Sequence, residues 1–312
     1  MDIMESDKEM GQPFTKEQGY LTSAYGGEQF LDQALNLACS IKRFDPTRSI
    51  SLITDARLAS QAGYYKKLNY FENIFVFEAN QLSGFKGKLL GSEVSPYKRT
   101  IYADSDCLLV QKVEWLWAHM ESQDFCVQGE SVYQGTYAGL DVKHWREQLG
   151  IPCLPVFNGG CFSWNESGKK VLRRAVQILE DARNYFLPSG TYGFDDDQPA
   201  IGIAMAEFNI KPLSNSLNLH YSFTNGSDLL LDLSKGFCKF KKGEYWAEPS
   251  VFHYNALVSA DMYRSASRKV LRKEINDMRR HFGLKDFHWR FPGPKVIFSL
   301  IKNGLWPFKD NR

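Results

Sequence analysis

The sequence predicts an α/β protein built on a mixed, mostly parallel, doubly wound sheet flanked by helices. Two observations predict this class. Segments with strand and helix patterns alternate through the first hundred residues, and acidic residues follow directly after apolar strands. Such alternation is typical of a parallel sheet covered by helices. Ligands of these sheets bind beyond the carboxyl ends of the strands, so the acids mark a candidate cleft.

The expected elements follow one another along the chain. YLTSAYGG, SISLIT and NIFVFEA have strand composition, and apolar residues recur at helical spacing between Phe30 and Ile41. A second helix is expected around Leu58–Leu68. Further along, TIYADSD predicts a fourth strand, VFNGGCFSWN a strand–turn–strand unit, DDDQPAIGIAMAEF an acidic loop entering a helix, and SVFHYNA a short strand with a histidine at its end.

Composition places the 312-residue chain among soluble globular proteins, with 43% hydrophobic and 24% charged residues. Its six cysteines are scattered and form no CxxC pair, which argues against a zinc ribbon or thioredoxin-type site and predicts a reducing, cytoplasmic setting. No apolar run reaches the roughly 18 residues of a membrane-spanning helix. Residues 1–18 are acidic and polar, and we expect them to be flexible.

The charge is divided unevenly between the body and the C-terminal segment. Residues 261–312 carry 13 Lys and Arg against five Asp and Glu, a net charge of +8, whereas residues 1–260 carry 25 against 31, a net charge of −6. Aromatic and basic residues interleave through 264–309, which suits peripheral contact with an anionic membrane. The alternative is a basic helix that packs on the body. No recognisable nucleic-acid module is present, so no nucleic acid is expected as a partner.

The stretch YADSD, Tyr102–Asp106, places two carboxylates inside an otherwise apolar strand. Such acids must leave the core or find a counter-charge. Side chains two apart in an extended segment point the same way, so Asp104 and Asp106 can reach one ion, and their oxygens suit Mg²⁺ or Mn²⁺. The alternative is a strand end that turns into solvent. The chain has no GxGxxG or GxxxxGK[ST] loop, so any phosphate would need another counter-charge.

Four blocks resemble the family 8 glycosyltransferases, which include glycogenin and bacterial lipopolysaccharide galactosyltransferases. KLLGSEVSPYKRTIYADSD is similar to the family's donor-site segment, with Lys88, Tyr97, Asp104 and Asp106 in register with its Lys, Tyr and DxD. FNGGCFSWN, DDDQPAIGIAM and FHYN resemble the next three blocks. All four keep the family order across about residues 20–258.

The resemblance implies a GT-A fold over 19–260, with 261–312 as a basic helical and aromatic appendage. It implies transfer of a hexose, with retention, from a nucleotide diphosphate sugar, usually UDP-linked, to a carbohydrate or glycoconjugate acceptor. A Mn²⁺ or Mg²⁺ cofactor would be bound by Asp104, Asp106 and His253 and would act as a Lewis acid on the diphosphate.

The resemblance also assigns residues to the donor. Asp197 and Gln198 would lie near the anomeric carbon as catalytic residues. Seven more would contact the donor: the base would pack near Tyr25 and Phe30, Lys88 would face phosphate, and the rest of the set is Ser105, Asn158, Gly159 and Gly160.

Each assignment has a plainer alternative. His253 could be a core histidine, and the acids Asp195–Asp197 could simply complement a helix N-terminus. Gly159 and Gly160 could form a hairpin turn, Lys88 could be a solvated surface lysine, and Phe30 could belong to the core.

Two other functions stay open on the sequence alone. One is a different divalent-metal phosphate enzyme, such as a phosphohydrolase that uses DSD. The other is a non-catalytic sugar-binding or membrane-binding module on the same fold. The intact Asp104, Asp106 and Asp197-Gln198 argue against the second. It stays open because the segment HYNALVSADMY lacks the Gly and the Lys-Pro-Trp with which the family continues its His motif.

Overall fold

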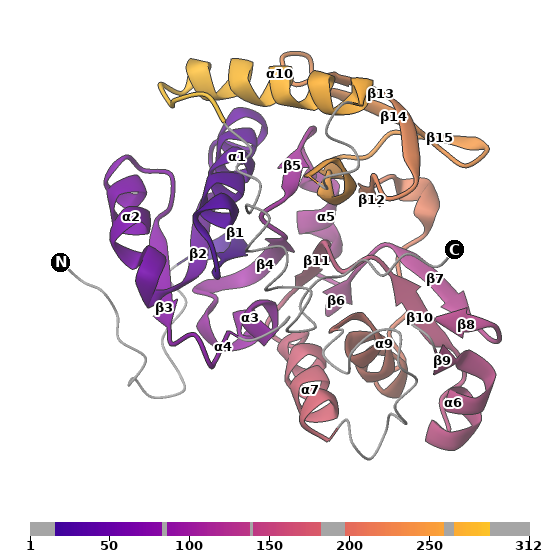
Figure 1. Ribbon diagram of the computed structural model, residues 1–312. Coiled ribbons are helices and arrows are strands. Elements are labelled where there is room, and N and C mark those ends of the chain that lie inside the picture. The colour runs from indigo at the N-terminus through magenta and orange to yellow at the C-terminus, as the bar shows by residue number, and fades with distance from the viewer. Residues whose placement is uncertain (1–15, 83–85, 138–139, 182–196, 259–264, 288–312) are drawn as a thin grey trace, which may run out of the picture.

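A computed structural model describes residues 16–82, 86–137, 140–181, 197–258 and 265–287 (Figure 1). Its centre is a six-stranded sheet. The strand order is β3 (Asn73–Phe77), β2 (Ser49–Asp55), β1 (Lys16–Ala24), β4 (Tyr97–Ala103), β11 (Cys161–Trp164) and β6 (Phe125–Cys126). The first four strands are parallel, and β11 runs antiparallel to both of its neighbours. The predicted mixed, mostly parallel sheet is confirmed.

Helices cover both faces of this sheet (Figure 1). They are α1 (Glu28–Phe44), α2 (Ala56–Lys67), α3 (Lys86–Leu89), α4 (Gly91–Val94), α5 (Glu114–His119), α7 (Lys169–Glu180) and α9 (Asp197–Glu207). The predicted helix at residues 58–68 is therefore α2, which begins where the Asp55 carboxylate accepts a hydrogen bond from the backbone N–H of Leu58. An aspartate at this position stabilises the first turn because the N–H groups there have no partner within the helix.

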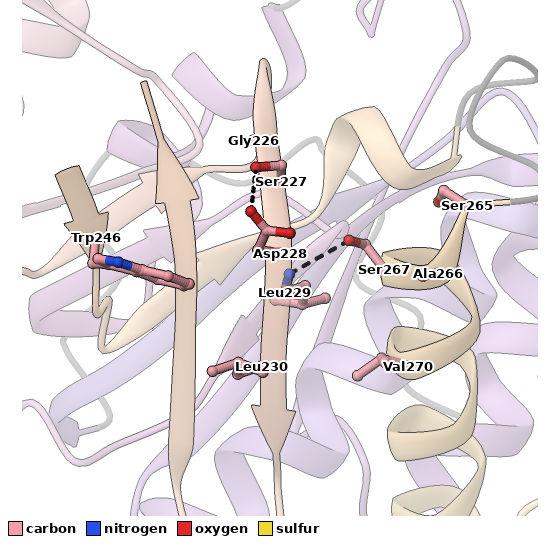
Figure 2. A pocket seen from close by; sticks show the side chains of 10 residues that line it. All are labelled: Gly226, Ser227, Asp228, Leu229, Leu230, Trp246, Ser265, Ala266, Ser267 and Val270. Atoms are coloured by element: carbon pink, nitrogen blue, oxygen red, sulfur yellow. Dashed lines mark hydrogen bonds between the residues drawn. The ribbon is translucent and has the colours of Figure 1, made fainter. Parts of the chain in front are cut away.

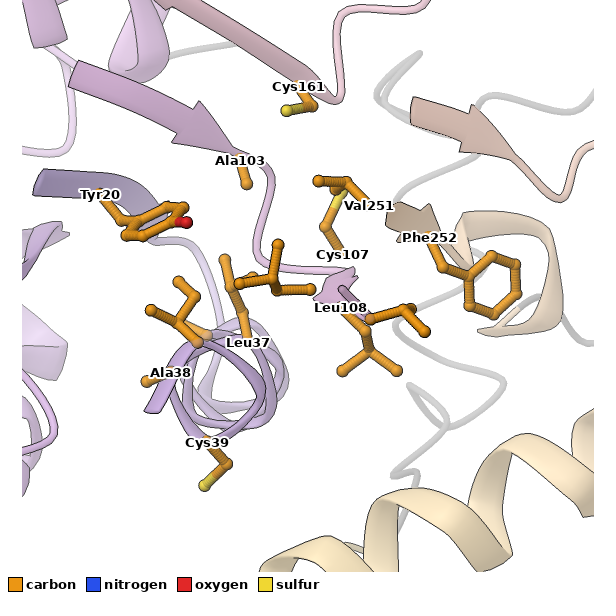
Figure 3. Packing of buried hydrophobic residues seen from close by; sticks show 14 of the residues in the cluster. Tyr20, Leu37, Ala38, Cys39, Ala103, Cys107, Leu108, Cys161, Val251 and Phe252 are labelled. Atoms are coloured by element: carbon orange, nitrogen blue, oxygen red, sulfur yellow. The ribbon is translucent and has the colours of Figure 1, made fainter. Parts of the chain in front are cut away.

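Two apolar cores lie on opposite faces of the sheet. Tyr20 and Ile101 belong to the core shared with α1, and their neighbours Leu21 and Tyr102 belong to the core shared with α7 and α9. Successive side chains of a strand point to opposite faces, so one strand contributes to both cores. Figure 3 shows the first core, where Leu108 packs near Leu37 of α1.

A smaller sheet stands beside the central one, in the order β12 (His220–Ser222), β16 (Val251–His253) and β5 (Cys107–Leu109). β5 continues directly from β4, so the chain passes from one sheet to the other at residues 104–106. The predicted strand SVFHYNA is β16. An antiparallel sheet of β13 (Gly226–Asp232), β14 (Phe237–Lys242) and β15 (Tyr245–Ala247) follows β12.

The remaining elements are short. They are β7 (Gly129–Val132), which pairs with β10 (Leu154–Phe157); β8 (Thr136–Tyr137), which pairs with β9 (Leu140–Asp141); α6 (Val142–Leu149); and the 3₁₀ turns η1 (Asn215–Leu217) and η2 (Asn255–Val258).

Two details differ from the sequence predictions. β1 begins at Lys16, so residues 16–18 belong to the sheet rather than to the flexible segment expected over 1–18. The unit VFNGGCFSWN is strand–turn–strand as predicted, but it is not a hairpin: β10 pairs with β7 and β11 pairs with β4 and β6. The turn at Gly159 and Gly160 therefore connects two different sheets.

The basic C-terminal segment contributes α10 (Ala266–His281), which lies along α1 and β13 (Figure 1). Its residues Leu271, Ile275 and Met278 are buried in the same core as α1. The apolar side of this helix thus packs on the body, as in the alternative to membrane contact. Of the predicted membrane-contacting segment, residues 264 and 288–309 lie outside the described residues.

Within the described residues, no helix is both long enough and apolar enough to cross a membrane. All six cysteines are free, and five of them are buried.

Candidate metal and donor site

Asp104 and Asp106 lie in the turn that joins β4 to β5, at the carboxyl end of a central strand. The backbone holds this turn on both sides: Asp104 N–H donates to the Gly160 carbonyl over 2.8 Å, and Cys107 N–H donates to the Asp104 carbonyl over 3.0 Å. β16 pairs antiparallel with β5, which sets His253 opposite Cys107. One ligand atom from each of Asp104, Asp106 and His253 falls within 4.8 Å of the others. The three residues expected to bind metal are therefore together.

The chemistry of this group fits a divalent ion. Two carboxylates and one imidazole supply hard oxygen and nitrogen ligands of the kind that Mn²⁺ and Mg²⁺ take. The Asp104 and Asp106 side chains are only 24% and 21% exposed, so their charges are costly without a counter-ion. Hydrogen bonds also orient the first carboxylate, because the Tyr102 hydroxyl donates to Asp104 Oδ1 over 3.0 Å.

Lys88 bridges two carboxylates beneath the turn. Its Nζ lies 3.3 Å from Asp104 Oδ1 and 3.2 Å from Asp197 Oδ2, and its side chain is 6% exposed. Burial by itself lowers the pKa of this lysine, but the two carboxylates outweigh burial and raise the pKa, so Lys88 stays charged. Lys88 is not the solvated surface lysine of the plainer alternative.

Asn158 fixes the tautomer of His253. Its Oδ1 accepts the backbone N–H of Gly160 over 3.1 Å and also lies 3.0 Å from His253 Nδ1. Because this atom is an acceptor, Nδ1 carries hydrogen. Nε2 is left to face Asp106, whose Oδ1 lies 3.1 Å away. Metal-binding histidines commonly have the second ring nitrogen held in this way by a neighbouring acceptor.

His253 and Asp106 perturb each other's protonation. Burial lowers the pKa of His253, but the carboxylates of Asp106 and Asp104 outweigh it and raise that pKa above 6.5. Burial likewise raises the pKa of Asp106, and His253 outweighs it and lowers that pKa below 3.8. Below the raised pKa of His253, the metal-free pair is therefore a buried ion pair.

The two glycines allow close packing around these side chains. A Cβ on Gly160 would come 2.4 Å from His253 Nδ1, and a Cβ on Gly159 would come 3.1 Å from Asp197 Oδ2. Any larger residue at position 160 would displace the imidazole. The pair of glycines therefore makes room for His253 and Asp197 rather than forming a hairpin turn.

Asp197 and Gln198 begin α9 beside this turn. Asp197 is 1% exposed and pairs with Lys88, and Gln198 Oε1 accepts the Gly159 N–H over 3.1 Å. Asp197 is therefore more than a surface acid that complements a helix N-terminus. Its neighbours Asp195 and Asp196 lie outside the described residues.

The other predicted donor residues do not all lie near Lys88 and the carboxylates. Tyr25 packs against Gly87, and burial, partly opposed by Lys88, raises the pKa of its phenol to about 12. Ser105 is buried, with its Oγ 3.5 Å from Gln33 Oε1. Phe30 is 40% exposed on the first turn of α1 and is not a core residue. Tyr25 therefore lies near the charged centre, whereas Phe30 has no described contact with it.

His220 is a residue of this region that the sequence interpretation missed. Its ring stacks on that of His253, with centroids 5.5 Å apart, and it is 4% exposed. Burial, reinforced by His253, holds its pKa well below 6.5, so the ring is neutral. The sequence LNLHYS places this histidine in an ordinary strand pattern, and only the pairing of β12 with β16 brings it to the site.

A separate cavity of about 400 Å³ lies between β13, β15 and the first turn of α10 (Figure 2). Leu230, Trp246 and Val270 line it, and Ser267 Oγ accepts a hydrogen bond from Leu229 N–H at its edge. It contains none of the predicted donor or metal residues.

Comparisons with known proteins identify the fold. No family model matches the chain, and no curated protein matches its sequence. A solved structure of the galactosyltransferase LgtC in complex with donor and acceptor sugar analogues superposes with a TM-score of 0.54 at 12% identity, covering 84% of this chain and 95% of that one. An active-site mutant of LgtC gives 0.53 at 11% identity with the same coverage. GlyE from Streptococcus pneumoniae gives 0.48 at 12% identity, over 93% of this chain and 64% of that one.

The chain therefore has the GT-A fold of glycosyltransferases, as the sequence predicted. Figure 1 shows this fold: the central sheet lies between its helices, and the smaller sheet lies at its edge.

Proposed function

We propose that this protein is a metal-dependent glycosyltransferase of the family 8 type, which transfers a hexose from a nucleotide diphosphate sugar, most simply UDP-linked, to a carbohydrate acceptor with retention. One observation carries the proposal: Asp104, Asp106 and His253 gather at the carboxyl end of β4. In open α/β sheets this is where ligands bind. The motif order along the sequence supports the family, and the fold supports the reaction class.

In the proposal, Asp104, Asp106 and His253 hold a Mn²⁺ or Mg²⁺ ion. When bound, the ion supplies Lewis-acid stabilisation of the diphosphate. Asn158 keeps the hydrogen on Nδ1 of His253, so Nε2 is the nitrogen available as a ligand. Tyr102 orients Asp104 through its hydroxyl.

Lys88 has a positioning role in this scheme. Its ammonium contacts both Asp104 and Asp197 and so holds the start of α9 beside the proposed metal ligands. Asp197 and Gln198 are proposed to bind hydroxyl groups of the donor sugar close to its anomeric carbon. Gly159 orients Gln198, because its N–H donates a hydrogen bond to Gln198 Oε1.

The decisive experiment measures the melting temperature of the purified protein with UDP, with and without Mn²⁺. A ligand that binds only the folded state stabilises it by about 2.7 kcal/mol at 100 times its Kd. We expect a UDP-dependent increase that requires Mn²⁺ and disappears in D104N/D106N. Asp124→Asn is the matched control, since Asp124 pairs with Lys170 on the surface.

Two results would contradict the proposed glycosyltransferase function, and each would favour a different alternative. If UDP gives no increase and aryl phosphates are cleaved with Mn²⁺, the protein is a metal-dependent phosphohydrolase. If UDP binds with Mn²⁺ but no UDP-hexose is consumed, with or without added sugar acceptors, it is a non-catalytic module. If a UDP-hexose is consumed, the anomeric configuration of the product, read by NMR, tests retention.

A further inference from the structure

Cys107, His220 and His253 occupy three neighbouring strands of the small sheet and share one of its faces. Cys107 pairs directly with His253 across β5 and β16, so their side chains lie on the same face. His220 pairs with Val251, which is two residues before His253 on β16 and therefore also on this face. Figure 3 shows Cys107 and Leu108 pointing to opposite sides of β5.

The side chains of these three residues converge. One ligand atom from each lies within 4.8 Å of the other two, and all three residues are buried. The Cys107 thiol donates to the Gly160 carbonyl over 3.3 Å. His220 Nε2 is fully buried and makes no hydrogen bond to any described residue. A buried imidazole nitrogen without a partner is unfavourable, and it points to a ligand that would bind it.

We propose that Cys107, His220 and His253 form a second metal site, specific for a borderline or soft divalent ion such as Zn²⁺, which competes with the hard ion at Asp104 and Asp106. A thiolate and two imidazoles are ligands that Zn²⁺ and Co²⁺ take, whereas Mg²⁺ and Mn²⁺ favour carboxylates. In a tetrahedral zinc site the ligand atoms are about 3.3 to 3.6 Å apart, given Zn–N and Zn–S bonds of about 2.0 and 2.3 Å. Because the three ligand atoms already lie within 4.8 Å of one another, binding needs them to approach by no more than about 1.5 Å.

The soft and hard ions compete because His253 belongs to both groups of ligands. Both nitrogens of His253 are already engaged, one by Asn158 and one by Asp106. A soft ion on Nε2 removes a ligand from the hard-ion group. A soft ion on Nδ1 breaks the contact with Asn158 that fixes the tautomer, and it also repels a second dication on the same ring. Either arrangement weakens binding of the hard ion.

The test uses Co²⁺ as a spectroscopic stand-in for Zn²⁺ on the full, metal-stripped chain. We expect one equivalent of Co²⁺ to give a near-ultraviolet thiolate-to-metal absorption band that Zn²⁺ abolishes. The band should vanish in Cys107→Ser and persist in Cys238→Ser, a cysteine buried in β14. His220→Gln should weaken the band and lower Zn²⁺ affinity by tenfold or more. This variant keeps the thiol, so it decides the question if Cys107→Ser does not fold.

The second arm measures Mn²⁺ affinity by EPR with and without one equivalent of Zn²⁺. We expect Zn²⁺ to weaken Mn²⁺ binding by tenfold or more in the unmodified protein and by much less in Cys107→Ser. A missing cobalt band, a band that survives in Cys107→Ser, or Mn²⁺ affinity unaffected by bound Zn²⁺ would each overturn the proposal. The cobalt band needs no nucleotide and no activity, so it can appear even if the glycosyltransferase proposal fails.

Discussion

The Nζ atom of Lys88 lies 3.2 Å from Oδ2 of Asp197, and both side chains are almost fully buried. Because the same ammonium also contacts Asp104, one positive charge joins α3, the β4–β5 turn and the start of α9. The contact links residues more than a hundred positions apart, and it ties the candidate catalytic acid to the candidate metal ligands.

Replacing Lys88 by Met should destabilise the protein by about 3–5 kcal/mol, because it leaves the buried Asp197 carboxylate without its counter-charge. The free energy of unfolding in urea measures the loss. Lys98→Met is the control, since Lys98 pairs with Glu17 in solvent and should cost about 1 kcal/mol or less. Adding Asp197→Asn to Lys88→Met should recover part of the loss, and a double variant less stable than Lys88→Met would contradict the pairing.

Gly160→Ala should impair metal binding while largely preserving the fold. The new Cβ would come 2.4 Å from His253 Nδ1 and push the ring away from Asn158. Disturbing the groups that orient a metal ligand costs about 10–100-fold in affinity. Titration with Mn²⁺ followed by EPR measures this, and Gly63→Ala serves as the control because nothing lies within 4 Å of its Cβ position. Unchanged Mn²⁺ affinity in Gly160→Ala would show that His253 is not a ligand.

The stability of the metal-free protein should depend on pH through His253 and Asp106. The pKa of His253 is raised above 6.5, so its contribution is complete below pH 6.5 and is lost as the pH rises through the raised value. The pKa of Asp106 is lowered below 3.8, so its contribution is present above pH 3.8 and is lost as the pH falls through the lowered value.

Urea unfolding in EDTA from roughly pH 5 to pH 9 measures this dependence in the wild-type protein and in His253→Gln. The stability advantage of the wild type should be greatest near pH 5 and should shrink above pH 6.5. An advantage that is constant or grows with pH would contradict an ion pair between these two side chains.

The basic C-terminal helix should be essential for stability. Ile275→Ala removes a fully buried side chain from the core shared with α1 and should cost about 2–5 kcal/mol. Lys273→Ala lies two residues away on the exposed side and should stay within about 0.5 kcal/mol. Equal, small losses in both variants would mean that α10 does not pack on the body in solution.

The sequence was sufficient to predict the elements that depend on local pattern. The strand TIYADSD, the helix that begins at Glu28 and the short strand that ends at His253 all follow from hydrophobic periodicity. The turn at Asp104 could be predicted because two charges cannot stay inside a buried strand. The antiparallel sheet from β13 to β15 was not predicted, because its strands are half-exposed and three of the six residues of β14 are lysines.

The interior of the candidate site depends on contacts between residues far apart in the sequence, which a local sequence pattern cannot predict. Lys88 looks like any surface lysine until the folding of α3 and α9 encloses it. Gly160 reads as a turn residue, and its contact with His253 is visible only when β16 is placed beside β5. His220 was missed for the same reason. Its strand β12 has no motif of its own and reaches the site only because it pairs with β16.

The order in which the ligands occur along the chain has a consequence for synthesis. The first two candidate metal ligands lie near residue 105, but the third lies at residue 253, and the helix that covers the adjoining core ends at His281. During translation this candidate ligand set can therefore be complete only after residue 253 has left the ribosome. A nascent chain that ends before β16 has both carboxylates but lacks the imidazole.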